Sequence, residues 1–237
     1  MIVSLDNSYH SDLLFLPARS VKGDLVGLEI IANFVSDDGS VRMPTELVIP
    51  RLSAEEQCRL FEEKLSLIET CQHFFIQQKL NAWIKLTPAV VDALIYDDQF
   101  NARVKRFSFL ELMINENYPE LNRGKENPKL VKLAARFPLI LANFGAGDSS
   151  MKAIFDGLFK RVALDKSFVQ HRAMSISFEP FMQAIVSQIS SCCDSVIIAG
   201  IDTEEMKARV TPLGFSVLQG CLWPAVSVGQ ITTLVQR

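Results

Sequence analysis

Short apolar runs alternate along the chain with longer segments in which apolar side chains recur at helical spacing. The short runs predict strands at 13–18, 25–34, 82–86, 107–114, 139–142, 162–164, 195–199 and 215–218. The longer segments predict helices at 53–78, from 88 onward, 128–137, 150–159, 177–191 and 204–210. Strands and helices therefore alternate along nearly the whole chain.

Several helix starts carry their own signals. Ser53 and Glu56 have the S-x-x-E spacing of a capping box, in which side chains satisfy the first free N–H groups of a helix. Thr87-Pro88 combines a capping threonine with a proline at the first helical position. Ser177 and Thr203 stand directly before two further helical segments, so we expect them to be N-caps.

Near-continuous apolar strands separated by helices indicate a parallel sheet that is covered on both faces. Seven or eight such units in 237 residues favour a single closed (β/α)8 barrel of the TIM type, while a doubly wound open sheet is the alternative. We expect one α/β domain spanning 1–237. A turn at 37–40 and a polar loop at 122–127 interrupt the pattern.

Composition narrows the possible partners. The chain is 49% hydrophobic and carries a formal net charge of −3, so it has no basic excess with which to bind nucleic acid directly. A small ligand or a protein partner fits better. The first residues lack the pattern of a signal peptide, and no apolar run approaches the ~18 residues needed to cross a bilayer. We therefore expect a cytoplasmic protein with no membrane contact.

Sulfur and imidazole ligands do not form a metal motif. The five cysteines make no CxxC pair and the three histidines are isolated, so no zinc spacing occurs. Scattered free thiols are typical of a reducing compartment. No P-loop, GxSxG or HExxH motif is present either. The pattern alone therefore predicts an α/β domain without a recognisable chemical motif.

Six short segments nevertheless resemble one bacterial family in their order and spacing. They are Gly27-Leu28-Glu29-Ile30-Ile31, Lys85-Leu86-Thr87-Pro88, Leu112-Met113-Ile114-Asn115-Glu116, Asn143-Phe144-Gly145-Ala146-Gly147, Ala163-Leu164-Asp165 and Gln219-Gly220. Over roughly residues 10 to 230 the chain resembles the EAL domain, a cyclic di-GMP phosphodiesterase. In that family a barrel opens its carboxyl-terminal face to cyclic di-GMP, and two Mg²⁺ or Mn²⁺ ions activate the attacking water.

The resemblance implies that part of the family's site is retained. Glu29 matches the metal-binding glutamate of the E-A-L triplet, and Glu116 matches a glutamate associated with an active-site loop. Asp165 matches the aspartate of a Lys-x-Asp motif, and Gln219 matches the closing Gln-Gly. We treat these four residues as the remnant of the family's metal and substrate site.

The other matching positions carry side chains that cannot do the family's chemistry. Among the family's metal ligands, Lys85 replaces an asparagine, Met113 replaces a glutamate, and Ala142 and Asn143 replace the paired aspartates. Asn33 replaces the arginine that binds the phosphate of the substrate. Ala163 replaces the catalytic lysine, and Ala199 replaces the proposed general base. An ammonium group cannot ligate a cation, and one carboxylate cannot hold two divalent ions. We therefore expect no metal, no cofactor, no catalytic residues and no meaningful phosphodiesterase activity.

Structural roles are the simpler explanation for several of these residues. We expect Lys85 to pair with Glu29, because a lysine in a cation's former place neutralises the same carboxylate. Met113 and Ala142, at strand ends, are expected to fill the old cavity. Trp83 is predicted to lie in the core and Trp223 to pack at its rim.

Three functions remain open. The chain is similar to enterobacterial EAL-like anti-activators of the flagellar master regulator FlhDC. That resemblance implies binding to the FlhD subunit and repression of flagellar genes and motility, with a protein partner and no direct contact with nucleic acid. The alternatives are a receptor that binds cyclic di-GMP without cutting it, and a residual enzyme with an altered site. A small-molecule ligand is the less favoured reading, because few phosphate-gripping groups are left.

Overall fold

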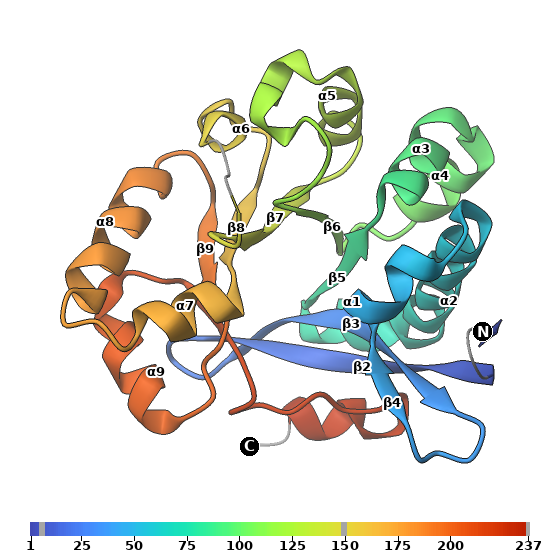
Figure 1. The fold of residues 1–237 in the computed structure, drawn as a ribbon, viewed down its shortest axis with the longest axis horizontal. Helices are drawn as coiled ribbons and strands as arrows, with labels where there is room; N and C mark the ends of the chain where they lie inside the picture. Colours follow the sequence, from blue (N-terminus) through green and yellow to red (C-terminus); the bar gives the residue numbers. More distant parts are fainter. Residues whose placement is uncertain (5–7, 148–150, 236–237) are drawn as a thin grey trace.

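The computed structural model of the protein describes residues 1–4, 8–147 and 151–235. Its strands form one ten-stranded sheet with the order β1-β2-β10-β9-β8-β7-β6-β5-β3-β4. An additional pairing of β2 with β3 closes eight of these strands into a barrel. Figure 1 shows the helices arranged around the outside of these strands. The closed (β/α)8 barrel predicted from the sequence is confirmed, and the open sheet is excluded.

The strands are β1 (Ile2–Ser4), β2 (Ser8–Ser20), β3 (Leu25–Ser36), β4 (Arg42–Pro44), β5 (Asn81–Leu86), β6 (Leu110–Asn115), β7 (Leu139–Phe144), β8 (Arg161–Leu164), β9 (Ser195–Ile198) and β10 (Val217–Gln219). From β3 through β10 the barrel pairings are parallel. β2 runs antiparallel to both of its barrel neighbours, β3 and β10. The expectation of a wholly parallel sheet is therefore wrong for β2, because a tight turn rather than a helical crossover joins β2 to β3.

The α-helices are α1 (Thr45–Val48), α2 (Ala54–Gln78), α3 (Pro88–Tyr96), α4 (Asp98–Lys105), α5 (Pro128–Ala134), α6 (Lys152–Phe155), α7 (Lys166–Arg172), α8 (Phe178–Ile189) and α9 (Glu204–Val210). The 3₁₀ segments are η1 (Ile49–Arg51), η2 (Leu121–Glu126), η3 (Thr211–Leu213) and η4 (Val228–Val235). The loop expected at 122–127 is thus largely the 3₁₀ segment η2. Helices α4 and α7 were not predicted, because each is short and directly adjoins another element.

Local signals placed the start of α2 correctly. Ser53 Oγ accepts a hydrogen bond from Glu56 N, and Glu56 Oε2 accepts one from Ser53 N, which completes the predicted capping box. Thr87 caps α3 and Thr203 caps α9 through the same type of side-chain acceptor. Ser177 does not cap α8 with its side chain, because its Oγ contacts Ser175 Oγ instead.

Some of the predicted strands and helices are longer than those in the structure. β6 begins at Leu110 rather than 107, and α5 ends at Ala134 rather than 137. α6 ends at Phe155, and the predicted lead-in at Ser149 and Ser150 lies outside the described residues. The predicted turn at 37–40 joins β3 to β4. No helix among the described residues is long and apolar enough to cross a membrane.

Three apolar clusters form among the described residues, and the two largest build the barrel. The larger layer lies between the strands and the surrounding helices and includes Phe75, Leu112 and Met182. The smaller layer fills the barrel interior, with Trp83 and Met113 among its buried members. Trp83 is a core residue as predicted, and Trp223 is half-buried and packs against the outer layer, also as predicted. The packed interior leaves only the ends of the barrel for polar groups.

Candidate functional site

Glu29 lies inside the barrel where the ladder between β3 and β5 ends. It is only 4% exposed. Lys85 Nζ lies 3.2 Å from its Oε1, and Gln219 Nε2 donates a hydrogen bond of 3.1 Å to its Oε2. The predicted pairing of Lys85 with Glu29 is therefore confirmed. The Glu29 carboxylate holds the pKa of Lys85 above its usual value, against the opposing effect of burial.

A second lysine approaches the same carboxylate from outside the barrel. Lys64 belongs to the buried face of α2, between Phe61 and Leu65, and is only 6% exposed. Burial lowers the pKa of Lys64 to about 8, although the nearby Glu29 partly offsets that effect. No described residue forms a hydrogen bond or ion pair with its ammonium group. The sequence analysis missed Lys64, although a single lysine among the apolar positions of α2 was the available signal.

Amide groups connect the neighbouring strand ends. Asn115 Nδ2, at the end of β6, donates to Asn143 Oδ1 over 3.2 Å, and Asn143 Nδ2 donates to Asp165 Oδ2 over 3.0 Å. Asp165 also caps α7 by accepting a hydrogen bond from Phe168 N. Asn143 adopts the left-handed region with a φ of 59°, which asparagine tolerates better than most residues. The position of a paired aspartate is thus held by a neutral amide that bridges two strands.

Glu116 organises the segment after β7. Its Oε1 accepts a hydrogen bond of 3.0 Å from Gly145 N, and its Oε2 accepts one of 2.7 Å from Gly147 N. Gly145 has a φ of 98° and packs so closely on the Phe168 ring that a Cβ would lie 2.8 Å from it. Both glycines therefore serve the backbone of this segment. A cavity of about 410 Å³ lies beside Glu116, between its own loop and Gly147.

Gly220 also has a packing role. A Cβ on Gly220 would lie 2.2 Å from the carbonyl oxygen of Ile201, so only glycine fits where these two strand-end loops meet. This close contact fixes the end of β10, from which Gln219 Nε2 donates its hydrogen bond to Glu29. The family-like Gln219-Gly220 pair therefore joins β10 to the site through backbone geometry.

Three of the substituted positions carry apolar side chains that are buried in the barrel interior. Met113, Ala142 and Ala163 are buried and belong to the apolar layer of the barrel interior, together with Trp83. Met113 and Ala142 are therefore buried in the barrel interior, and that they fill a former metal site stays a prediction. Asn33 and Ala199 are half-buried, and neither forms a side-chain contact with Glu29.

The side chains around Glu29 cannot ligate the two divalent ions that the resemblance implies. The charge of the buried Glu29 carboxylate is already met by Lys85. Within the described ranges, no group of three or more histidine, cysteine, aspartate or glutamate side chains converges as metal ligands would. Hard cations need several oxygen ligands, and an ammonium group 3.2 Å from the carboxylate repels them.

Comparison with known proteins agrees with this geometry. A family model described as the EAL domain matches residues 7–224. The chain belongs to the EAL domain family. The EAL barrel is thus retained here, and the replacement of the family's metal ligands stays a prediction from the resemblance.

Relatives within the family differ in what they are called. The anti-FlhC(2)FlhD(4) factor YdiV of Salmonella paratyphi B is 66% identical over 237 residues, which is 100% of both chains. The crystal structure of the EAL-like domain protein YdiV superposes with a TM-score of 0.89 at 54% identity, covering 99% of this chain and 100% of that one. The PaMucR phosphodiesterase in complex with c-di-GMP has a TM-score of 0.74 at 18% identity, over 93% and 94% of the two chains. That more distant likeness shows the fold alone.

Proposed function

We propose that this protein is an anti-activator that binds the FlhD subunit of the flagellar master activator FlhDC. In this role it keeps the activator off flagellar promoters in the cytoplasm, and so represses flagellar gene expression and motility. It neither binds nor hydrolyses cyclic di-GMP. The observation that carries the proposal is the 66% identity, over the full length of both chains, to a Salmonella anti-FlhC(2)FlhD(4) factor.

The altered site supports the non-enzymatic part of the proposal. A phosphodiesterase of this family needs two metal ions, and here Lys85 occupies the position next to Glu29 where a cation would have to bind. Met113 and Ala142 add apolar bulk where the family has carboxylates. Loss of metal ligands, general base and catalytic lysine together removes most of the transition-state stabilisation that the reaction requires.

The charge of the chain supports the choice of partner. A net charge of −3 gives no electrostatic attraction to DNA, so a regulator of this kind acts on the activator protein rather than on the promoter. A barrel covered by helices offers a rigid outer surface for such a contact (Figure 1).

Direct binding tests the partner. Purified protein is titrated into the FlhDC complex in a calorimeter, and promoter DNA occupancy is followed by gel shift. We expect saturable binding and release of the activator from DNA in proportion to the protein added. Absence of heat and of any change in the gel shift would reject the anti-activator function.

A second titration tests the ligand. Cyclic di-GMP is added with and without Mn²⁺, and the products are separated by chromatography. We expect no binding and no hydrolysis. Micromolar binding without turnover would favour the receptor instead, and turnover would show that an altered site still catalyses. The variant Lys85→Asn, which places the family's asparagine beside Glu29, serves as the matched comparison for metal binding.

A further inference from the structure

The turn between α7 and α8 presents the two most exposed large apolar side chains of the described residues. Ile176 is 100% exposed and Met174 is 82% exposed. They stand two residues apart, whereas the other strongly exposed apolar side chains lie on different elements, for example Ile2 on β1 and Tyr96 on α3. Single exposed apolar residues need no explanation, whereas neighbouring exposed apolar side chains can belong to an interaction site.

Backbone hydrogen bonds fix this turn. Ser175 N donates to Arg172 O over 2.9 Å, and Phe178 N donates to Ser175 O over 3.2 Å. Ser177 N donates to Ser175 Oγ, which places a side-chain acceptor inside the turn. The turn therefore holds its shape without Met174 or Ile176 being packed against anything.

Arg209 on α9 anchors the turn from the side. Its Nη1 donates to Ala173 O over 3.1 Å, its Nη2 lies 2.6 Å from Glu179 Oε1, and its guanidinium stacks over the Phe178 ring. These contacts connect the turn to both α8 and α9. A preformed apolar protrusion loses little conformational entropy on binding, which favours its use as an interface anchor.

The charge beside the two apolar side chains is positive. Arg172 stacks over Phe168 and Phe181, with 4.7 Å from its Cζ to the Phe181 centroid, and no carboxylate within the described residues pairs with it. Glu179, in the first turn of α8, is already neutralised by Arg209. A complementary surface would therefore combine an apolar groove with a carboxylate at its border.

We propose that the turn Arg172–Ser177 is the anchor with which this protein holds the activator of the proposed function. Met174 and Ile176 insert into an apolar groove of the activator, and Arg172 meets a carboxylate at the edge of that groove. The inference rests on the proposed function, because it names the surface through which that function acts. It places the interface on the outer edge of the molecule, on the side opposite α2 (Figure 1).

The test compares two double variants in calorimetric titrations with the activator. Met174→Ser/Ile176→Ser removes the apolar anchors, and Ile76→Ser/Tyr96→Ser removes two exposed apolar side chains of α2 and α3 that are 59% and 69% exposed. We expect the first to raise the Kd at least about tenfold and the second to leave it within about twofold. Arg172→Gln is expected to raise the Kd about threefold and to weaken its salt dependence. Circular dichroism checks that each variant is folded.

The outcomes separate the two proposals. Wild-type protein that does not bind the activator rejects the proposed function and the anchor with it. Wild-type binding that the Met174/Ile176 variant retains at full strength rejects the anchor alone. Association of wild-type protein with vesicles of phosphatidylcholine and phosphatidylglycerol, lost in that variant while activator binding is unchanged, would assign the turn to a lipid surface instead. A wild-type dimer that the variant abolishes, again with unchanged activator binding, would assign it to self-association.

Discussion

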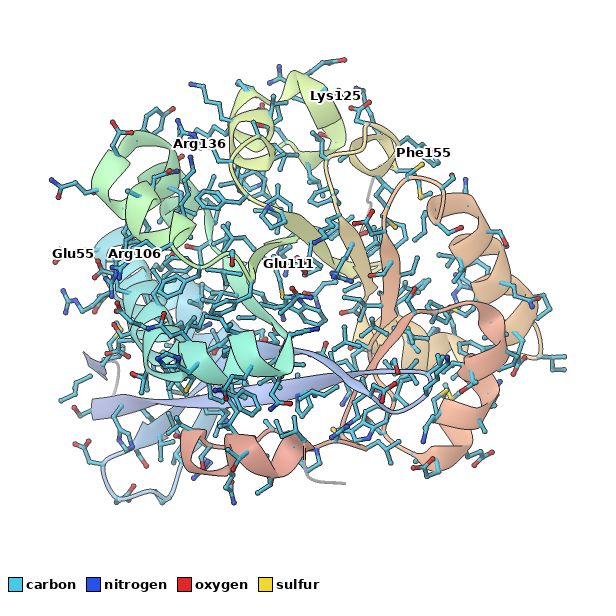
Figure 2. The ribbon with its side chains drawn as sticks, turned by 180° about the vertical axis from the view of Figure 1, so that it is seen from behind. Glu55, Arg106, Glu111, Lys125, Arg136 and Phe155 are labelled. Carbon is cyan, nitrogen blue, oxygen red and sulfur yellow. The ribbon has the colours of Figure 1, made fainter. Side chains whose placement is uncertain are left out.

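The two ends of the barrel interior each bury one glutamate, and they treat it differently. At the amino end Glu111 on β6 is 2% exposed. Arg161 donates to both of its carboxylate oxygens, with the shorter hydrogen bond at 2.7 Å, and Lys160 Nζ and Trp83 Nε1 add contacts of 2.9 Å each. In Figure 2 Glu111 lies among the strands at the centre of the molecule, whereas Glu55 and Arg106 lie at its periphery.

At the carboxyl end Glu29 has one cation and one amide as partners. Lys85 is 36% exposed in its side chain, and the second nearby cation, Lys64, forms no direct contact with Glu29. The amino end therefore has the complete set of charge-assisted hydrogen bonds that a buried carboxylate requires. The carboxyl end has fewer partners for its glutamate. The difference indicates that the buried glutamate at the amino end contributes more to stability than the one at the carboxyl end.

Replacement of Glu111 is expected to have the largest effect. Glu111→Gln leaves Arg161, whose side chain is only 12% exposed, without its anion, and we expect a loss of about 3–5 kcal/mol in the free energy of unfolding. Urea denaturation at pH 7 measures this loss. The matched control is Glu120→Gln, which breaks a surface pair with Arg123 and should cost less than about 1 kcal/mol. An equally small loss for both variants would contradict the assigned role of the amino end.

The same variant has a defined pH dependence. Burial alone would raise the pKa of Glu111, but hydrogen bonds from Arg161 and Lys160 outweigh it and hold the pKa below its usual value. The stability that Glu111 contributes is therefore present above the pKa of the unfolded chain, and is lost as pH falls through the lower folded pKa. Wild type and Glu111→Gln should accordingly converge in stability under acid conditions.

Removal of Lys64 is expected to stabilise the protein. The folded pKa of Lys64 is about 8 and its ordinary value is 10.5, so at pH 7 the folded state carries a buried ammonium group at a cost of roughly 3 kcal/mol. Lys64→Met should raise the free energy of unfolding by about that amount. Between pH 8 and 10.5 the folded protein has lost the Lys64 proton while the unfolded chain still holds it. The free energy of unfolding of wild type therefore rises over this range, and that of the variant lacks this rise.

Thermal unfolding across this pH range checks the prediction. The gap between Lys64→Met and wild type should narrow as pH rises. Lys132→Met, at an exposed position on α5, is the control and should leave the pH dependence as in wild type. A destabilised Lys64→Met protein would instead mean that the ammonium group has a partner that compensates for its burial.

Replacement of Glu29 is expected to have the smallest effect of the three. Glu29→Gln keeps the shape of the side chain, and the Lys85 ammonium can turn to water because its side chain is about one-third exposed. We expect a loss of about 1 kcal/mol in urea denaturation, well below that of Glu111→Gln. A loss as large as that of Glu111→Gln would remove the distinction between the two ends of the barrel.

The sequence predicted those parts of the structure that short-range rules control. The capping box of Ser53 and Glu56 set the start of α2, and Thr87-Pro88 set the start of α3, because capping hydrogen bonds connect residues three positions apart. The pairing of Lys85 with Glu29 was also predictable, since the resemblance had already placed both residues in one site. Ser177 shows the limit of such rules, because its hydroxyl had a closer partner in Ser175.

Long-range contacts decided the rest. The pairing of β2 with β10 joins segments from opposite ends of the chain, and no local pattern indicates it. The sequence shows Lys64 only as a polar residue on an apolar helix face, and its burial near Glu29 depends on how α2 packs against the strands. The partners of Glu111 are likewise set by packing, because Arg161 lies on β8 and Lys160 directly before it, far from Glu111 in the sequence. The sequence by itself determined the alternating elements, the family and the pairing of Lys85 with Glu29, because these depend on residue type and order. Only the tertiary structure decided that Lys64 is buried near Glu29, that Glu111 meets Arg161 and Lys160, and which apolar side chains stay exposed, because these depend on distances between segments far apart in the chain.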